Sequence, residues 1–130
     1  KHVKVEPARW YYHCDKEGIL VWQDMPSGDM GNQWAPHTYN GGTDKERSSA
    51  SIANYYQEWK EIMDLCVSHP SVVVWVPFNE AWGQFDTEKV AEWTKNYDPS
   101  RLVNPASGGN HRACGDILDL RACSCLTRNG

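Results

Sequence analysis

The sequence feature that most constrains the fold is a short apolar run between two prolines, Val72 to Val76. Pro70 precedes this run, Pro77 follows it, and four of its five residues are valines. A run of this length, rich in β-branched residues, is typical of a strand that is buried on both faces. Such strands occur in parallel sheets with helices around them, so we expect an α/β fold.

Helical and strand patterns alternate along the rest of the chain. We predict helices over residues 6–17, 52–67 and 87–97, and strands over 19–22, 72–76, 102–103 and 117–120. Repeating βα units of this kind form a parallel sheet. Four strands cannot close an eight-stranded barrel, so the chain is either a small open sheet or an internal piece of a larger (β/α)₈ barrel.

The ends of the predicted helices carry recognisable signals. Gly18 follows the first helix, where a glycine commonly ends the last turn. Ser49 or Ser51 is expected to cap the second helix, and Asp86 or Thr87 the third, because their oxygens accept hydrogen bonds from free backbone N–H groups.

The groups that directly follow the central strand suit carbohydrate chemistry. Glu80 supplies a carboxylate, Asn79 an amide that can hydrogen-bond a hydroxyl, and Trp82 an indole that can stack on a sugar face. Functional groups of parallel α/β folds lie at the carboxyl ends of strands. Trp75, Phe78 and Trp82 also predict an apolar wall beside the carboxyl of Glu80. The alternative is that Glu80 is a solvated acid at the start of a loop, as most glutamates are.

A long segment without periodicity, residues 25–50, separates the first predicted strand from the second helix. Loops of this length in compact domains are usually functional or mobile. Trp34, His37 and Tyr39 lie in it and are candidates for ligand contact, with Trp34 the strongest. The alternative is a surface loop anchored by its aromatic residues.

Composition excludes several classes of partner. The 130 residues allow one modest domain, and the net charge of −4 argues against a nucleic-acid partner. No apolar run approaches the ~20 residues of a membrane span. We predict that Cys14 and Cys66 are small buried hydrophobic residues. Cys123 and Cys125 lack a second pair at zinc spacing, and we expect neither a metal nor a cofactor.

Two stretches carry a resemblance to a known family. Residues 74–83, Val-Trp-Val-Pro-Phe-Asn-Glu-Ala-Trp-Gly, resemble the fourth-strand segment of glycoside hydrolase family 2, the β-galactosidase, β-glucuronidase and β-mannosidase group. Residues 18–26 resemble the strand-three segment of the same family. The resemblance covers about residues 1–120 and implies a partial (β/α)₈ TIM barrel, from the end of strand two to strand six.

The resemblance implies a retaining glycosidase that acts on a β-glycoside. It assigns the general acid/base to Glu80 and a hydrogen bond with the sugar 2-hydroxyl to Asn79. Asp24 is expected to contact the substrate or orient it, and His2 to line the site from the end of strand two. Trp82 and Trp34 complete the expected set of substrate contacts.

The second carboxylate of such an enzyme is not recognisable in this chain. The family places it on a glutamate of strand seven, and no glutamate follows Glu92. Of the later acids, Asp98 ends a helix on the wrong side and Asp119 lies where the family has no nucleophile. We therefore expect a fragment that carries the acid/base but lacks the nucleophile strand, and that is inactive alone.

Residues 121–130 show no helix or strand pattern. We interpret them as an irregular tail of out-of-frame or foreign sequence, with a diverged end as the alternative. Two other functions stay open for the chain as a whole: a carbohydrate-binding fragment without catalysis, and a small α/β protein in which the tryptophans only fill the core.

Overall fold

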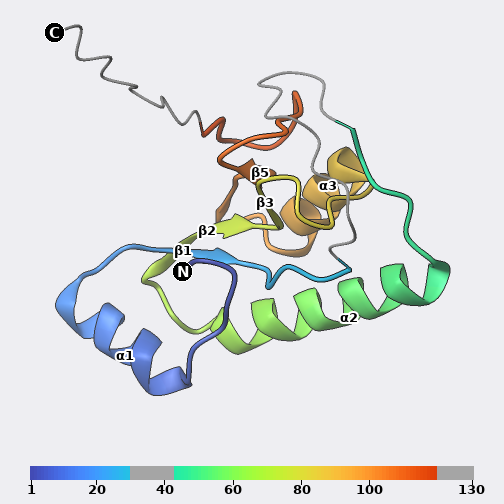
Figure 1. The fold of residues 1–130 in the computed structure, drawn as a ribbon. Coiled ribbons are helices and arrows are strands. Elements are labelled where there is room, and N and C mark those ends of the chain that lie inside the picture. Colours follow the sequence, from blue (N-terminus) through green and yellow to red (C-terminus); the bar gives the residue numbers. More distant parts are fainter. Residues whose placement is uncertain (30–42, 120–130) are drawn as a thin grey trace, which may run out of the picture.

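Parallel strands form the centre of the structure and helices pack against them (Figure 1). The computed structural model describes residues 1–29 and 43–119. The elements in chain order are α1 (Ala8–Glu17), β1 (Val21–Asp24), α2 (Ser49–Cys66), β2 (Val72–Val76), β3 (Phe78–Asn79), α3 (Thr87–Tyr97), β4 (Leu102–Val103) and β5 (Ala106–Ser107). This alternation is that of a (β/α)₈ barrel, of which the described residues form a part that is not closed. No helix in these two ranges is both long and apolar enough to cross a membrane.

Two parallel sheets follow one another along the barrel wall. β1, β2 and β4 form the first sheet in that order, and β3 pairs with β5 in the second. Each strand of the second sheet continues one of the first after a proline, Pro77 or Pro105. Proline cannot donate a hydrogen bond to the ladder, so the strands break there and resume. Asn79 of β3 then lies opposite Ser107 of β5.

The outer face of the sheet packs against α1, α2 and α3. Trp75 of β2 contacts Trp59 of α2 edge to face, with ring centroids 5.7 Å apart. Trp59 Nε1 donates to Thr94 Oγ1 of α3 at 2.9 Å. On β1, Gln23 lies next to Trp75 in register and accepts a 2.6 Å hydrogen bond from Tyr11 of α1. Cys14 and Cys66 belong to the same buried core, which confirms their prediction.

Most predicted elements are present with shifted ends. The strands at 72–76 and 102–103 have the expected bounds. The first strand, expected at 19–22, is Val21–Asp24 instead. Gly18, with φ of 69°, ends α1, and Ile19 still bonds back to Cys14 of that helix. The chain therefore enters the sheet two residues later, and Ile19 and Leu20 are exposed.

The predicted strand at 117–120 is wrong over its described residues, 117–119, which form no strand. Asp116 N and Ile117 N both donate to the carbonyl oxygen of Val103, at 2.8 and 3.2 Å. This converging pair of bonds ties the segment to β4 without starting a ladder. Residues 106–107, which lie outside every predicted strand, form the short strand β5.

The helix caps also differ from expectation. Ser48, not Ser49 or Ser51, caps α2, and its Oγ accepts from Ser51 N at 3.2 Å. Neither Asp86 nor Thr87 caps α3 through its own side chain. The acceptor comes from a distant residue, Asp44, whose Oδ2 lies 3.0 Å from Thr87 N.

Candidate functional site

The candidate site is built on the tight turn that follows β3. Glu80 N donates to the carbonyl oxygen of Ser107 at 2.8 Å, so the ladder with β5 extends to Glu80. Trp82 N then donates to Asn79 O at 3.0 Å and closes the turn. Glu80 and Ala81 have φ of 47° and 68°, a left-handed conformation that residues other than glycine seldom adopt. The turn thus holds Glu80 at the carboxyl end of the second sheet.

The side chains of this turn are largely enclosed. Asn79 is 2% exposed, and its Oδ1 has no hydrogen-bond partner among the described residues. The same holds for Nε1 of Trp82. The carboxyl group of Glu80, which is half-buried, lies against Gly108: a Cβ at Gly108 would stand 2.8 Å from Glu80 Oε1. Glu80 therefore reaches across to the loop after β5.

The expected apolar wall beside Glu80 is wrong for two of its three members. Trp75 packs on α2, and its Nε1 donates to Asp98 at 2.9 Å. Phe78 stacks on Tyr55 of α2 with ring centroids 5.4 Å apart. Both rings fill the layer between sheet and helices. Strict alternation would place residues 75 and 78 on opposite faces, but the strand breaks at Pro77, and β3 turns Phe78 to the same side as Trp75.

A second group of predicted site residues meets at the end of β1. Asp24 is the last residue of this strand, and its Oδ2 accepts from Val3 N at 2.9 Å and lies 3.6 Å from His2 Nδ1. Burial raises the pKa of Asp24, against the lowering effects of the Val3 N–H, the chain's amino group and His2. Asp24 and Glu80 thus share the carboxyl edge of the strands. Trp34, His37 and Tyr39 lie outside the described residues.

The structure adds residues that the sequence pattern did not single out. Ser107, opposite Asn79, donates through Oγ to Asp119 at 3.1 Å. Gln84 is 1% exposed and donates to the carbonyl oxygen of Asn110 at 2.9 Å. One sequence feature could have drawn attention to Ser107: the Gly-Gly pair at 108–109, which follows it shortly after a predicted strand. No local signal marks Gln84, whose partner is distant in sequence.

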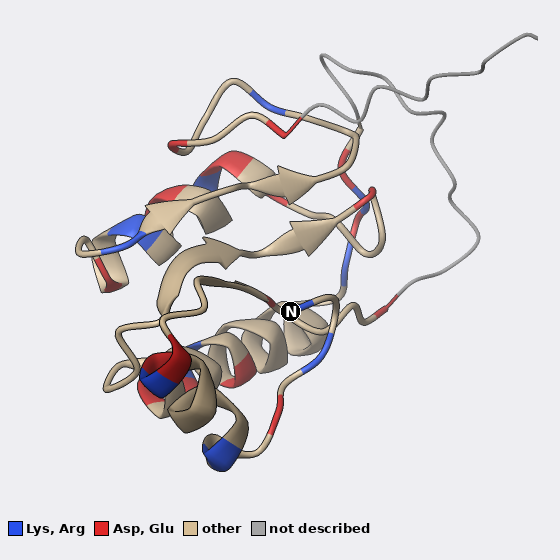
Figure 2. Cartoon of the chain, turned by 90° about the vertical axis from the view of Figure 1, so that its left-hand side faces the viewer, with Lys and Arg blue, Asp and Glu red and all other residues tan. Residues whose placement is uncertain are grey.

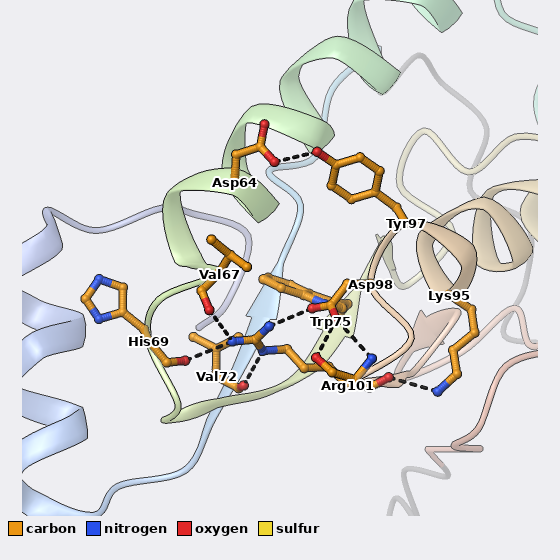
Figure 3. Close-up of polar contacts among 10 residues, drawn as sticks. Asp64, Val67, His69, Val72, Trp75, Lys95, Tyr97, Asp98 and Arg101 are labelled. Carbon is orange, nitrogen blue, oxygen red and sulfur yellow. Dashed lines mark hydrogen bonds and ion pairs between the residues drawn. The ribbon is translucent and has the colours of Figure 1, made fainter.

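A structural polar cluster lies at the amino ends of the strands, at the opposite end from the candidate site (Figure 3). Arg101 donates to the carbonyl oxygens of Val72, Val67 and His69, at 2.7, 3.0 and 3.2 Å. Its Nη1 also lies 2.6 Å from Asp98 Oδ2. Asp98 therefore joins α3 to the amino ends of the strands. Residues at that end of a barrel usually contribute to stability rather than to catalysis.

Charges elsewhere are mixed. Figure 2 shows acidic and basic residues interspersed over helices and loops. Within residues 1–29 and 43–119 no group of three or more His, Cys, Asp or Glu side chains is placed to hold a metal ion.

A parallel βα arrangement with its polar groups at the carboxyl ends of the strands is typical of α/β domains, TIM barrels among them. The family model "Glycosyl hydrolases family 2, TIM barrel domain" matches residues 6–125. The chain therefore belongs to glycosyl hydrolase family 2, as the resemblance predicted.

Named relatives agree with this assignment. The chain is 31% identical over 123 residues to a β-galactosidase of Halalkalibacterium halodurans, covering 88% of the chain and 11% of that protein. It is 29% identical over 110 residues to a β-galactosidase of Vibrio vulnificus, covering 85% and 10%. A β-glucuronidase structure from Parabacteroides merdae superposes with a TM-score of 0.52 at 18% identity, over 75% of this chain and 12% of that one, and supports the fold. The chain spans about a tenth of the length of these curated relatives.

Proposed function

We propose that these residues form the acid/base side of the active site of a retaining β-glycoside hydrolase. The observation that carries the proposal is the position of Glu80, at the carboxyl end of a parallel strand, directly after buried Asn79 and against Gly108. Family membership and the β-galactosidase names of the relatives support it. The site would work within a closed eight-stranded barrel. We use the term complete-barrel enzyme for a polypeptide that holds residues 1–120 in such a barrel.

The proposed chemistry divides between two carboxyl groups. Glu80 protonates the glycosidic oxygen as it leaves, while a second carboxylate, about 5–5.5 Å away, attacks the anomeric carbon and forms a glycosyl-enzyme. Glu80, now ionised, then takes a proton from the water that cleaves this intermediate, so the configuration is retained. Oδ1 of Asn79, which has no hydrogen-bond partner within residues 1–29 and 43–119, is suited to accept from the sugar 2-hydroxyl. Trp82, Asp24, His2 and Trp34 would contact the substrate.

One observation favours a second function, sugar binding without turnover. Within these 130 residues no glutamate follows Glu92, so the residues by themselves offer Glu80 no later glutamate as a nucleophile. In this case Asn79, Glu80 and Trp82 would only hydrogen-bond and stack on the sugar.

The experiment that tests the acid/base role is Glu80→Ala in the complete-barrel enzyme. An activated aryl glycoside, whose phenolate leaves without a proton, should lose little in the glycosylation rate. A natural disaccharide, whose alkoxide needs the proton, should lose about 10²–10⁴-fold. Azide needs no base, so it should restore turnover and give a glycosyl azide of retained configuration.

Glu92→Ala is the matched control, because this glutamate is exposed on α3 and should leave both substrates unaffected. An equal loss on both substrates after Glu80→Ala, with an inverted azide adduct or none, would show that Glu80 is not the acid/base.

A further inference from the structure

Arg47 is a buried charged residue that contacts the turn carrying Glu80. Its side chain is 4% exposed. Nε donates to the carbonyl oxygen of Gly83 at 2.9 Å, and Nη2 donates to the same oxygen and, at 2.9 Å, to that of Gly28. One guanidinium thus joins the loop after β1 to the turn after β3.

The surroundings of Arg47 fix its guanidinium in place. Its central carbon lies 4.6 Å from the ring centroid of Phe85 and 5.4 Å from that of Tyr55. Asp29 Oδ2 lies 4.0 Å from Nε and balances the charge. Lys45, which lies two residues before Arg47, donates through its backbone N to Gln84 O at 2.7 Å. The segment before α2 therefore holds two successive residues of the turn, Gly83 and Gln84.

The turn itself requires such support. Glu80, Ala81 and Gly83 all have positive φ, and non-glycine residues keep this conformation only where their surroundings hold them. Gly83 fits closely against the support: a Cβ there would stand 2.1 Å from Gly28 O and 2.5 Å from Arg47 Nη2. A shift of the guanidinium would therefore be passed to the turn that orients Glu80.

We propose that Arg47 is a positioning residue for the general acid, which acts through the Gly83 carbonyl to fix the direction of the Glu80 carboxyl. The proposal rests on the acid/base role of Glu80. Lysine cannot replace Arg47, because an ammonium group lacks the planar fork that reaches Gly83 and Gly28 together.

The test is Arg47→Lys in the complete-barrel enzyme, with Arg47→Gln as a second variant. A misdirected acid should lower the rate of the glycosylation step about 10- to 100-fold on a natural disaccharide and less than about 3-fold on an activated aryl glycoside. Amide hydrogen exchange should rise at residues 80–84. A purely structural loss would lower both substrates equally.

Arg101→Lys is the matched control. Arg101 is also buried, with 10% of its side chain exposed, and bonds three backbone carbonyls at the opposite edge of the sheet. This variant should lower the melting temperature. It should leave unchanged both the ratio of the activities on the two substrates and the amide hydrogen exchange at residues 80–84.

The outcomes separate this inference from the proposed function. If Glu80→Ala shows the substrate-dependent loss but both Arg47 variants lower the two substrates equally, Arg47 is not a positioning residue. An unchanged exchange rate at 80–84 would overturn the inference in the same way. If Glu80→Ala itself lacks the substrate dependence, the acid/base role fails, and the role of Arg47 fails with it.

Discussion

At the residue scale, Gly108 sets how closely the loop after β5 approaches Glu80. Its φ is 78°, and a Cβ would stand 2.8 Å from Glu80 Oε1 and 2.9 Å from its Cγ. We expect Gly108→Ala to displace the Glu80 carboxyl and to lower kcat of the complete-barrel enzyme about 10²-fold. Stability should also fall by about 1 kcal/mol, because alanine is strained at this φ. Steady-state kinetics and thermal melting measure the two effects.

Gly18→Ala separates the steric effect from the backbone strain. Gly18 has a similar φ of 69°, but a Cβ there would meet no atom of the described part of the chain within 4 Å. This variant should lose a similar stability and keep full activity. If both variants kept full activity, the close approach of Gly108 to Glu80 would have no catalytic importance.

Asp98 gives the chain a stabilising contribution that depends on pH. Burial by itself would raise the pKa of Asp98, but hydrogen bonds from Ser100, Arg101 and Trp75 outweigh burial and lower the pKa to about 2. Since the unfolded carboxyl has a pKa of about 4, the contribution is complete above about pH 4 and is lost as the pH falls to about 2. Asp98→Asn should lower the free energy of unfolding by about 2 kcal/mol at neutral pH.

Urea unfolding of the wild-type chain and of Asp98→Asn across this range checks the sign. The difference between them should shrink as the pH falls below about 4. Asp64→Asn, which removes an exposed carboxylate bonded to Lys60, should have little effect at any pH. A difference that grows on acidification would contradict the assignment.

Sequence alone could place Asn79, Glu80 and Asp24 near strand ends, because a buried strand ends where its apolar run ends. It could not show that Trp75 and Phe78 turn towards the helices, since a residue's face depends on the break at Pro77. The roles of Arg47 and Gly108 were also out of reach. Each acts on the Glu80 turn across a gap of more than twenty residues, and no periodicity records such a contact.

At the scale of elements, α3 depends on a residue far from it in sequence. Asp44 accepts from Thr87 N at 3.0 Å and Thr87 Oγ1 at 2.6 Å, and it pairs with Arg112 at 3.1 Å. The two Thr87 donors reach different oxygens of Asp44, and Asp44→Asn replaces one of these oxygens by an NH₂ group, so one of the two bonds is lost together with the charge that pairs with Arg112. We expect a loss of about 1 kcal/mol in the free energy of unfolding.

Asp86→Asn is the control for this prediction. Asp86 occupies the N-cap position but makes no side-chain cap, and its ion pair with Lys89 is exposed. Its replacement should change stability little in the same urea titration. A larger loss from Asp86→Asn than from Asp44→Asn would mean that the local residue caps α3.

The long elements were predictable because packing repeats along them, and the short ones were not. The buried residues of α2 recur at helical spacing, and β2 is a continuous apolar run. β5 has two residues, and its only requirement is to lie beside β3. Whether so short a segment forms a strand depends on its partner strand more than on its own sequence. For this reason 117–120 was predicted as a strand and 106–107 was not.

At the scale of the whole molecule, the described residues supply one sector of a barrel. On the sheet face opposite the helices, Trp22 and Leu102 are 41% and 47% exposed and lie on either side of Val74 in register. Inward-pointing residues of a complete barrel pack in layers against the other strands. The part of the chain that the structure describes therefore has helices on one face of its sheet, while the other face retains exposed apolar side chains.

The 130-residue polypeptide itself should not turn over a β-glycoside. Retaining hydrolysis needs two carboxyl groups on opposite sides of the scissile bond, and acid catalysis by Glu80 alone would contribute only about 10²–10⁴-fold. The other predicted site acid, Asp24, is buried and its Oδ2 accepts from Val3 N, an arrangement that suits a substrate contact better than an attacking carboxylate. Incubation of the purified polypeptide with an activated aryl glycoside should release no phenol above the spontaneous rate in buffer. Robust release above that rate would mean that a nucleophile lies within these residues, and replacing Asp24, Glu80 and Asp119 one at a time would then show which of them attacks.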